Sequence, residues 1–156
     1  ETAKALINAR SETVDQKLSF RDSFRVIRCL VPADGFIEWK VERKEKTPYY
    51  IFLKTRNIFS FAGFWAKWDK GSSPVYSYSI LTTRANTALA PIHERMPVIL
   101  EPSNYKLWLA SETDSRTLRD LLFPFNPDKM SAHKISKEIN SYKNDRDGLL
   151  NPLNSG

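Results

Sequence analysis

Short runs rich in β-branched and aromatic residues fill the middle of the chain and constrain its fold more than any other feature. Turn signals at residues 33–35 and 70–74 separate some of these runs. Strands joined by short turns pair antiparallel, because a parallel pair needs a crossover of about a dozen residues or more. The predicted strands are residues 29–32, 36–39, 49–53, 58–65, 75–83 and 96–100.

Helical patterns lie mostly outside this block of strands. Residues 11–28 carry a loose apolar stripe and predict a helix, and residues 85–89 predict a short one. Pro102 suits the first position of a helix over 103–110, and a polar cap begins another helix over 114–122. Because helices do not regularly separate the strands, the pattern favours an antiparallel-rich α+β fold over a doubly wound one.

The length of 156 residues fits one domain of ordinary size. We expect this domain over residues 1–145, followed by a polar tail over 146–156. No apolar run approaches the roughly 20 residues that cross a bilayer, and no N-terminal apolar segment resembles a secretory signal. A cytoplasmic protein is therefore expected, nucleoid-associated in a bacterium or nuclear in a eukaryote.

A single cysteine, Cys29, excludes an internal disulfide within these residues. The two histidines, His93 and His133, are too few for a Cys/His zinc site, so we expect no metal and no cofactor. Counting alone leaves a carboxylate site for Mg²⁺ open. Cys29 begins an apolar run and is predicted to be buried, although Arg25 and Arg28 would lower the pKa of an accessible thiol there.

The positive charge of the chain lies in its first two thirds. Residues 1–100 carry 16 Lys and Arg against 10 Asp and Glu, which accounts for the whole net charge of +6. The tryptophans Trp39, Trp65 and Trp68 lie in the same stretch. Basic side chains interleaved with aromatic ones suit a polyanion such as nucleic acid. The alternative is an ordinary basic protein.

Polar residues occupy two places where the surrounding pattern is apolar. Asn8 and Arg10 follow an apolar triplet, where they either bind an anion or end a strand and cap a helix. Glu38 lies between Ile37 and Trp39 in a predicted strand. There it is either partly buried, with a raised pKa suited to proton transfer, or exposed on an edge.

His93 lies between two prolines, directly before a predicted strand. A stiff connection of this kind often holds a catalytic group, although a packed structural histidine is the alternative. Thr82, Thr83 and Arg84 end another predicted strand. No known nucleophile motif accompanies these residues.

Trp108 is predicted to lie in the core, and the other tryptophans are core candidates first and base-stacking candidates second.

Six segments in order resemble the SRAP family, the SOS-response-associated peptidase-like proteins that act as abasic-site sensors. The matching strings are NARSET at 8–13, SFRDSF at 19–24, RCLVPADGFIEW at 28–39, FAGFW at 61–65, ILTTRAN at 80–86 and HERMPVIL at 93–100. Each string is weak by itself, but their common order over most of residues 5–140 makes coincidence implausible.

The resemblance implies a barrel-like β core flanked by helices, with a basic groove for single-stranded DNA. Family members form a thiazolidine crosslink between an N-terminal cysteine and the ring-opened abasic site. Asn8 then matches the residue that contacts the cysteine, and Glu38 and His93 match the acid–base groups. The resemblance implies an enzyme without a cofactor, acting as a monomer on single-stranded DNA that carries abasic sites.

A DNA-binding set follows from the same resemblance. Arg10, Thr82 and Arg95 match residues that hold phosphates, and Arg84 and Trp39 complete the predicted set.

The chain departs from the family pattern at its start, where Glu1 and Thr2 stand in place of an N-terminal cysteine. The expectation is a domain without its N-terminal segment: a fragment, the continuation of a longer polypeptide, or a naturally shortened copy. Two other functions stay open. One is a non-catalytic module that binds single-stranded DNA, and the other is a thiol-dependent peptidase that processes itself.

Overall fold

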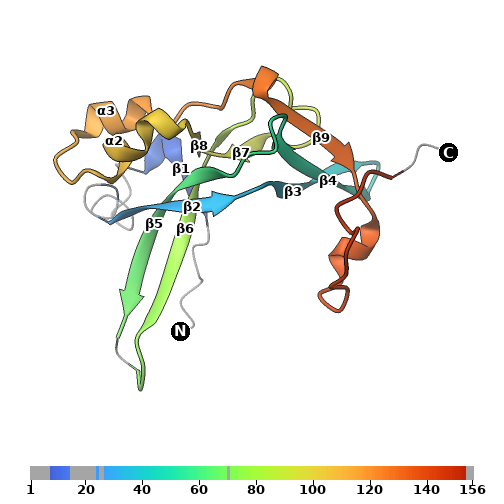
Figure 1. The fold of residues 1–156 in the computed structure, drawn as a ribbon, viewed down its shortest axis with the longest axis horizontal. Helices are drawn as coiled ribbons and strands as arrows, with labels where there is room; N and C mark the ends of the chain where they lie inside the picture. Colours follow the sequence, from blue (N-terminus) through green and yellow to red (C-terminus); the bar gives the residue numbers. More distant parts are fainter. Residues whose placement is uncertain (1–7, 15–23, 25–26, 70, 154–156) are drawn as a thin grey trace. The chain divides into compact units, whose positions relative to one another are not determined.

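The computed structural model describes residues 8–14, 24, 27–69 and 71–153 of the chain. The chain divides into two compact units, each with its own β-sheet (Figure 1). Unit 1 comprises Glu1–Pro32, Phe59–Arg84 and Met96–Phe125, and unit 2 comprises Ala33–Ile58, Ala85–Arg95 and Asn126–Gly156.

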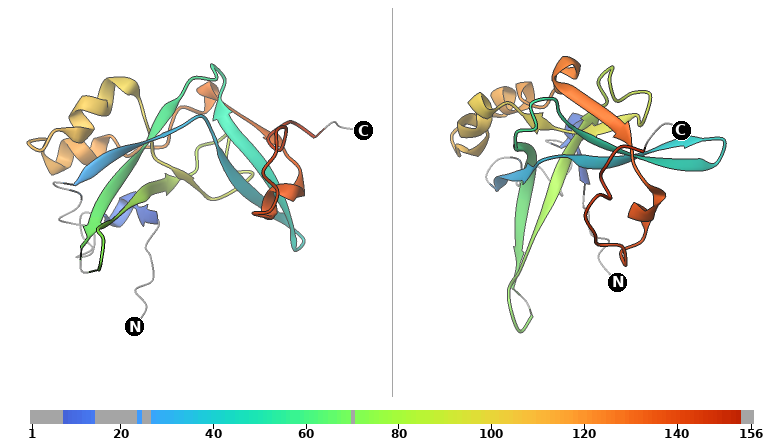
Figure 2. Two further views of the ribbon diagram at one scale, coloured as in Figure 1. Left: turned by 60° about the horizontal axis from the view of Figure 1, so that its bottom comes forward. Right: turned by 45° about the vertical axis from the view of Figure 1, so that its right-hand side comes forward.

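Unit 1 contains a six-stranded sheet built around two long strands, β5 (Phe59–Trp68) and β6 (Val75–Arg84), which pair antiparallel. β1 (Asn8–Arg10) runs parallel to β6 along its other edge. The sheet is completed by β2 (Arg28–Ala33) and β8 (Ile99–Leu100) beside β5, and by β7 (Arg95–Pro97) beside β6. Figures 1 and 2 show that β5 and β6 extend together as a long hairpin.

The side chains of β5 and β6 alternate between a core face and a second face. Leu81 and Thr83 are buried on the core face of β6, so Ile80 and Thr82 point to the second face. The register pairs Gly63 with Ile80 and therefore places it on the second face as well. Toward the turn, large side chains on both faces become exposed, because the hairpin extends past the core.

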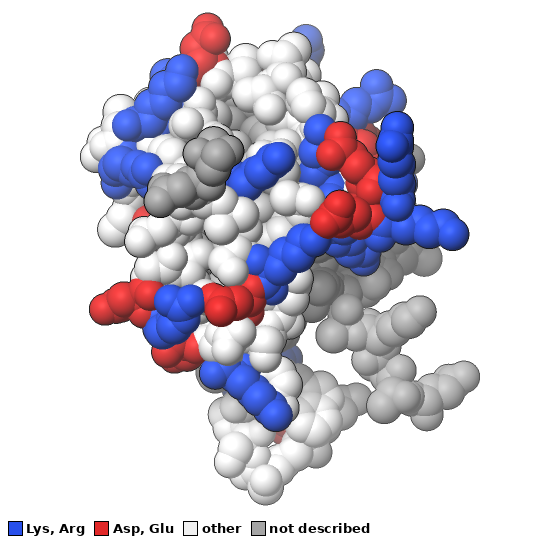
Figure 3. All heavy atoms as spheres, turned by 90° about the vertical axis from the view of Figure 1, so that its right-hand side faces the viewer, with Lys and Arg blue, Asp and Glu red and all other residues white. Residues whose placement is uncertain are grey.

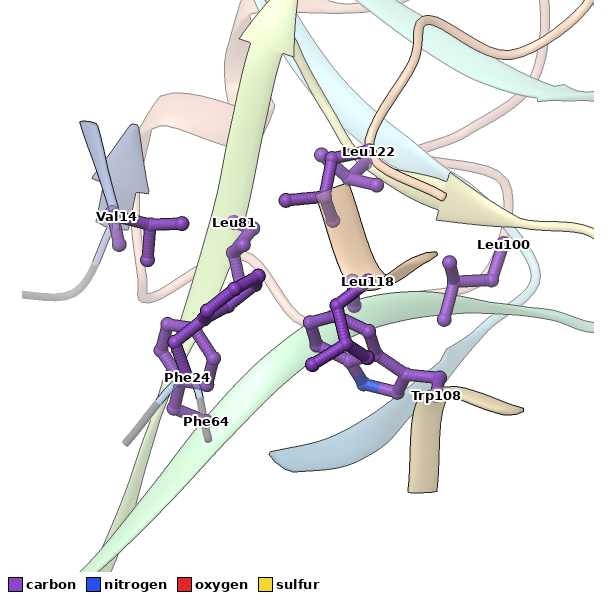
Figure 4. Packing of buried hydrophobic residues seen from close by; sticks show 11 residues of the cluster. Val14, Phe24, Phe64, Leu81, Leu100, Trp108, Leu118 and Leu122 are labelled. Carbon is purple, nitrogen blue, oxygen red and sulfur yellow. The ribbon is translucent and has the colours of Figure 1, made fainter. Parts of the chain in front are cut away.

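The core of unit 1 lies between the sheet and two short helices (Figure 4). Phe64 of β5 and Leu81 of β6 pack with Trp108 of α2 (Tyr105–Leu109) and Leu118 of α3 (Ser115–Asp120). The Trp108 side chain is fully buried, as predicted, and its ring stacks on that of Phe64 with the centroids 6.2 Å apart.

Both predicted helix starts in this region are confirmed. Pro102 begins the 3-10 turn Pro102–Asn104 that leads into α2. The Asp114 carboxylate accepts hydrogen bonds from the backbone N–H groups of Arg116 and Thr117, at 2.9 and 3.0 Å, and so caps α3. Such a cap satisfies two of the N–H groups that a helix leaves without partners at its start.

Arg28, the first residue of β2, is buried in unit 1. Its guanidinium group donates hydrogen bonds to three backbone carbonyls, those of Phe24, Trp108 and Ala110. It also lies over the Trp108 ring, 5.7 Å from the centroid. Burial lowers the pKa of this guanidinium, and the charge of Glu112 partly opposes that effect. Arg28 thus joins β2 to the end of α2.

Unit 2 contains a three-stranded antiparallel sheet in the order β3-β4-β9 (Figures 1 and 2). Its strands are β3 (Phe36–Glu42), β4 (Glu45–Leu53) and β9 (Met130–Lys134). Tyr50, Phe52 and Ile135 form its small core, against which Ile37 and Ile139 pack. Gly35 precedes β3 because a side chain there would collide with the Tyr50 ring, 2.3 Å from the position of a Cβ.

The predicted antiparallel-rich α+β fold is confirmed, and so are helices that flank a strand core. The helix predicted over 11–28 lies mostly outside the described residues, and Ser11–Thr13 at its start form a 3-10 turn. Within the described part of the chain, no helix is long and apolar enough to cross a membrane.

Three expectations were wrong. Residues 130–134 form β9, which was not among the predicted strands. Residues 85–89 form turns and no helix. The Trp65 and Trp68 side chains are 41% and 54% exposed, because the hairpin carries them beyond the core.

Candidate active site

Glu38 lies in the middle of β3, directly opposite Tyr49 of β4. The side chain is half-buried, which agrees with the first of the two alternatives that the sequence left open. Burial raises the pKa of Glu38 above its ordinary value of 4.5, while the charge of His93 and a hydrogen bond from the Trp39 backbone act in the opposite direction. A carboxyl group with a raised pKa can give and take protons closer to neutral pH.

His93 is held at the end of a closed loop over residues 85–95. The loop is closed by a hydrogen bond from the Ala85 N–H to the Glu94 carbonyl, at 2.9 Å. Inside it, the buried Asn86 side chain accepts hydrogen bonds from the N–H groups of Ala88 and Leu89, both at 3.1 Å. The His93 N–H then donates to the Leu89 carbonyl at 3.0 Å. These bonds make the loop a defined support for the imidazole ring.

The imidazole of His93 is anchored through Nδ1 alone. The Arg95 backbone N–H lies 3.1 Å from Nδ1 and donates to it when Nδ1 carries no proton. The Arg95 carbonyl oxygen lies 3.0 Å from the same atom and accepts when Nδ1 is protonated. Among the described residues, no hydrogen bond reaches Nε2. The Arg95 backbone therefore offers Nδ1 a hydrogen-bond partner in either tautomer of the ring.

Glu38 and His93 form an electrostatic pair within unit 2. The carboxyl group is raised in pKa by burial, and the imidazole presents Nε2 without a hydrogen bond from the described residues. A carboxyl group and an imidazole held close together suit general acid–base catalysis, in which one group removes a proton and another donates one.

A cavity of about 340 Å³ lies on the Glu38 side of the unit 2 sheet. Lys40 and Tyr49 line it from the strands, and Leu89, Pro91 and Ile92 line it from the loop that carries His93. Glu38 and Lys40 project to the same face of β3, because side chains two residues apart share a face. The lining thus includes neighbours of Glu38 and His93 along the chain, while neither Glu38 nor His93 itself lines the cavity.

Replacing His93 with alanine should raise the pKa of Glu38 further, because the charge of His93 lowers it in the native chain. An NMR titration that follows the side-chain carboxyl carbon of Glu38 measures this shift. His133→Ala is the matched control, since His133 lies on β9 and contacts the Leu150 carbonyl. A Glu38 pKa that stays in place or falls in His93→Ala would contradict an electrostatic pair.

A second group of predicted residues lies in unit 1. The parallel pairing of β1 with β6 places Asn8 beside Ile80 and Arg10 beside Thr82. Asn8 and Arg10 are exposed, while Ala9 between them is buried on the core face. Arg84 follows Thr82 on the second face of β6 and is also exposed. The structure thus collects Asn8, Arg10, Thr82 and Arg84 on the second face of this sheet, with Asn8 in a strand and not in a helix cap.

Trp39 points to the opposite face of β3 from Glu38, because adjacent strand residues alternate. Its indole N–H donates a hydrogen bond of 2.8 Å to the Asn140 side chain in the 3-10 turn Lys137–Asn140. Arg95 is half-buried beside His93 and supplies the backbone groups that hold its ring.

Sequence reasoning placed Trp65 in the core first and overlooked its two exposed neighbours, Tyr76 and Tyr78. The register pairs Trp65 with Tyr78, so both lie on the second face of the hairpin. Tyr76 shares this face, and its ring centroid lies 6.3 Å from that of Trp65. The period-two spacing of Tyr76, Tyr78 and Ile80 was the signal that could have identified this aromatic row.

Cys29 is half-buried in unit 1, and burial raises the pKa of its thiol. A thiol with a raised pKa is a poor nucleophile at neutral pH, because the thiolate is the reactive form. Within the described ranges of the chain, no cluster of three or more His, Cys, Asp or Glu side chains could hold a metal ion.

The charges are mixed on the face that Figure 3 presents, where Lys and Arg side chains are interspersed with Asp and Glu. Unit 2 contains several exposed ion pairs, one of them between Lys40 and Glu42 at 2.8 Å. Others join Lys137 to Glu45 and Arg146 to Glu138. Such exposed pairs contribute little stability.

The fold and the Glu38–His93 pair define a class of antiparallel-rich α+β proteins with acid–base groups on a strand and a neighbouring loop. The family model for SOS response associated peptidase (SRAP) matches residues 1–142. The chain therefore belongs to the SRAP family.

Named relatives extend this comparison. The abasic site processing protein YoqW of Bacillus subtilis is 44% identical over 148 residues, which cover 93% of this chain and 66% of the relative. The abasic site processing protein HMCES of Gallus gallus is 30% identical over 172 residues, covering 96% of this chain and 51% of the relative. The chain thus spans about two thirds or less of the length of these two relatives.

A solved structure shares the same fold. The crystal structure of a protein from Bacteroides thetaiotaomicron matches with a TM-score of 0.87 and 35% sequence identity. The match covers 94% of this chain and 65% of that protein.

Proposed function

We propose that this chain forms part of an abasic-site processing protein that acts on single-stranded DNA. The Glu38–His93 pair carries the proposal, because it joins a carboxyl group of raised pKa to an imidazole anchored through one nitrogen. Membership of the SRAP family supports it, since relatives in that family are named abasic site processing proteins.

The proposed reaction joins an abasic site to an N-terminal cysteine that lies outside these 156 residues. The sugar ring opens to an aldehyde, the cysteine amine adds to the aldehyde carbon, water leaves, and the thiol closes a thiazolidine ring. Ring opening and loss of water each move protons between oxygen or nitrogen atoms. Glu38 and His93 supply these transfers as general acid and base.

The polar residues of unit 1 would bind the DNA in this proposal. Arg10 and Arg84 are exposed cations, and the Thr82 hydroxyl lies on the same face of the sheet. Arginine suits phosphate because its planar group donates two parallel hydrogen bonds. Asn8 would contact the N-terminal cysteine, and Arg95 and Trp39 would contact the DNA from unit 2. Cys29 is excluded as the nucleophile, because its amine is part of a peptide bond and cannot close a thiazolidine ring.

The test uses the protein with its N-terminal cysteine, verified by mass spectrometry, and single-stranded DNA with one abasic site. The expected product is a protein–DNA species that survives denaturation and migrates more slowly on a gel. Undamaged DNA of the same sequence is the control and should give none. Absence of the species from the abasic reaction would overturn the crosslinking proposal.

A non-catalytic DNA-binding module is the second candidate, favoured by the exposed Arg10 and Arg84 beside an aromatic row. Binding of both DNAs without a crosslink, weakening steeply with salt, would identify this module. A peptidase would instead turn over unrelated peptides, and Glu38→Gln would abolish that turnover.

A further inference from the structure

The second face of the β5–β6 hairpin carries a row of large exposed aromatic side chains. Trp65 is 41% exposed, Tyr76 65% and Tyr78 61%, and Lys67 accompanies them by the same alternation. We call Trp65, Lys67, Tyr76 and Tyr78 the aromatic face. Monomeric proteins seldom expose apolar patches of this kind without a binding role.

A hollow of about 480 Å³ lies between the aromatic face and β2. Trp65, Tyr76 and Tyr78 line it from the hairpin, and Cys29 and Val31 line it from β2. Its volume falls in the range of roughly 300–1,000 Å³ typical of small-molecule sites, which a single nucleobase can enter.

Gly63 forms part of this hollow because it has no side chain. A Cβ there would lie 3.0 Å from the Val31 side chain and 3.1 Å from the Cys29 sulfur. Because Gly63 has no Cβ, the side chains of Val31 and Cys29 can lie over the hairpin, on the same face as Trp65.

Cations lie at both ends of the row. Lys67 is beside Tyr76 near the turn, and Arg10 and Arg84 lie on the same face at the other end of β6. Lys67 also pairs with Asp69 at 3.4 Å, but both side chains are exposed and such a pair is weak. From Tyr76 to Thr82 the strand spans about 20 Å, enough for several nucleotides.

We propose that the aromatic face binds the undamaged nucleotides that flank an abasic site, by stacking their bases on Trp65, Tyr76 and Tyr78. The identity of the ligand as single-stranded DNA rests on the proposed function. Flat aromatic rings stack on every base, while the flanking cations neutralise phosphates, so this surface binds single strands of any sequence. Asp69, which pairs with Lys67, is an acidic side chain next to this face, and it lies at the turn end of the row.

The hairpin provides a matched pair of tryptophans for the test. Trp65 and Trp68 lie three residues apart on β5, are similarly exposed, and project to opposite faces. Fluorescence anisotropy with the 156-residue chain and an undamaged oligothymidylate of about 12 nucleotides measures binding. Trp65→Ala should weaken binding about tenfold or more, Trp65→Phe less, and Trp68→Ala should leave it unchanged.

A second oligomer separates stacking from charge. A sugar–phosphate strand of the same length without bases should bind the native chain more weakly than the oligothymidylate. Trp65→Ala should not weaken its binding further. Lys67→Ala should weaken both oligomers alike and lower the salt dependence, because Lys67 contacts phosphate. Thermal unfolding of each variant verifies that these exposed substitutions leave the fold intact.

Two results would overturn the proposal. Equal effects of Trp65→Ala and Trp68→Ala on DNA affinity would show that the second face has no special role. Unchanged DNA affinity in Trp65→Ala, together with a changed oligomeric state by light scattering, would assign the face to a protein contact. Undamaged DNA is used throughout, so failure to crosslink abasic DNA leaves this test unaffected.

Discussion

Replacing Glu38 with glutamine should slow crosslinking of abasic DNA about 10²–10⁴-fold, the usual cost of removing a general acid–base group. Glutamine preserves the size of the side chain and its hydrogen bonding, but it cannot transfer a proton. Single-turnover gel assays with the N-terminal-cysteine protein measure the rate, and anisotropy with undamaged DNA measures binding, which should stay within about twofold, an energy of about 0.4 kcal/mol.

Glu42→Gln is the matched control for this variant. Glu42 lies on the same strand and the same face as Glu38, but it is exposed and paired with Lys40. Its replacement should leave the crosslinking rate unchanged. Equal losses of rate in the two variants would contradict a catalytic role for Glu38.

Replacing Glu38 with glutamine should also stabilise the fold at neutral pH. Burial raises the pKa of Glu38 in the folded chain, so the ionised carboxylate opposes folding at any pH above that pKa. Below the ordinary pKa of 4.5 the carboxyl group is protonated in both states, and the gain from Glu38→Gln should vanish. Urea unfolding at about pH 7.5 and about pH 4 measures this difference. A glutamate kept for stability would show a loss at neutral pH instead.

Replacing Arg28 with alanine should lower the free energy of unfolding by about 3 kcal/mol or more. Its guanidinium donates to the carbonyls of Phe24, Trp108 and Ala110, and alanine leaves these carbonyls without those donors. Hydrogen bonds from a charged group contribute about 1.5–3 kcal/mol each, and a buried acceptor without a partner costs about 1–3 kcal/mol. Urea or thermal unfolding of the 156-residue chain measures the loss.

Arg116→Ala tests whether the loss of stability is specific to the replacement of Arg28. Arg116 is exposed on α3, so its replacement should change stability by no more than about 0.5 kcal/mol. Arg28→Lys should be intermediate, because an ammonium group keeps the charge but cannot reach three carbonyls in the planar geometry of guanidinium. A similar stability for Arg28→Ala and Arg116→Ala would show that the buried hydrogen bonds contribute nothing net.

The strands that could be predicted are those whose own residues favour them. Residues 75–83 are rich in β-branched and aromatic side chains, and they form most of β6. Residues 130–134 lack that composition and become β9 because β4 offers them an edge, with Tyr49 paired to Lys134 and Leu53 to Met130. Strand formation of this kind depends on a distant partner, which a local pattern does not contain.

The candidate site shows a similar division. Alternation along one strand, a local property, gave partial burial of Glu38 as one of two alternatives, and it could not decide between them. The loop that holds His93 could not be predicted, because its conformation depends on the hydrogen bonds that the Asn86 side chain makes. Asn86 caps turns within the loop and also donates a hydrogen bond to the Met130 sulfur, far along the chain. Trp65 and Trp68 were predicted to be core residues because they are apolar. Their apolar character does not indicate that the hairpin extends beyond the core.

The arrangement around His93 bears on whether the proposed reaction can run backwards. The Arg95 backbone donates an N–H to Nδ1 when that atom carries no proton, and it offers a carbonyl when the atom does carry one. The imidazole therefore needs no rotation or change of partner residue when it is protonated. Formation and hydrolysis of a crosslink pass through the same proton transfers, so an imidazole that keeps its anchor can serve both directions. Such a site would govern how fast the equilibrium is reached and leave its position to the chemistry of the adduct.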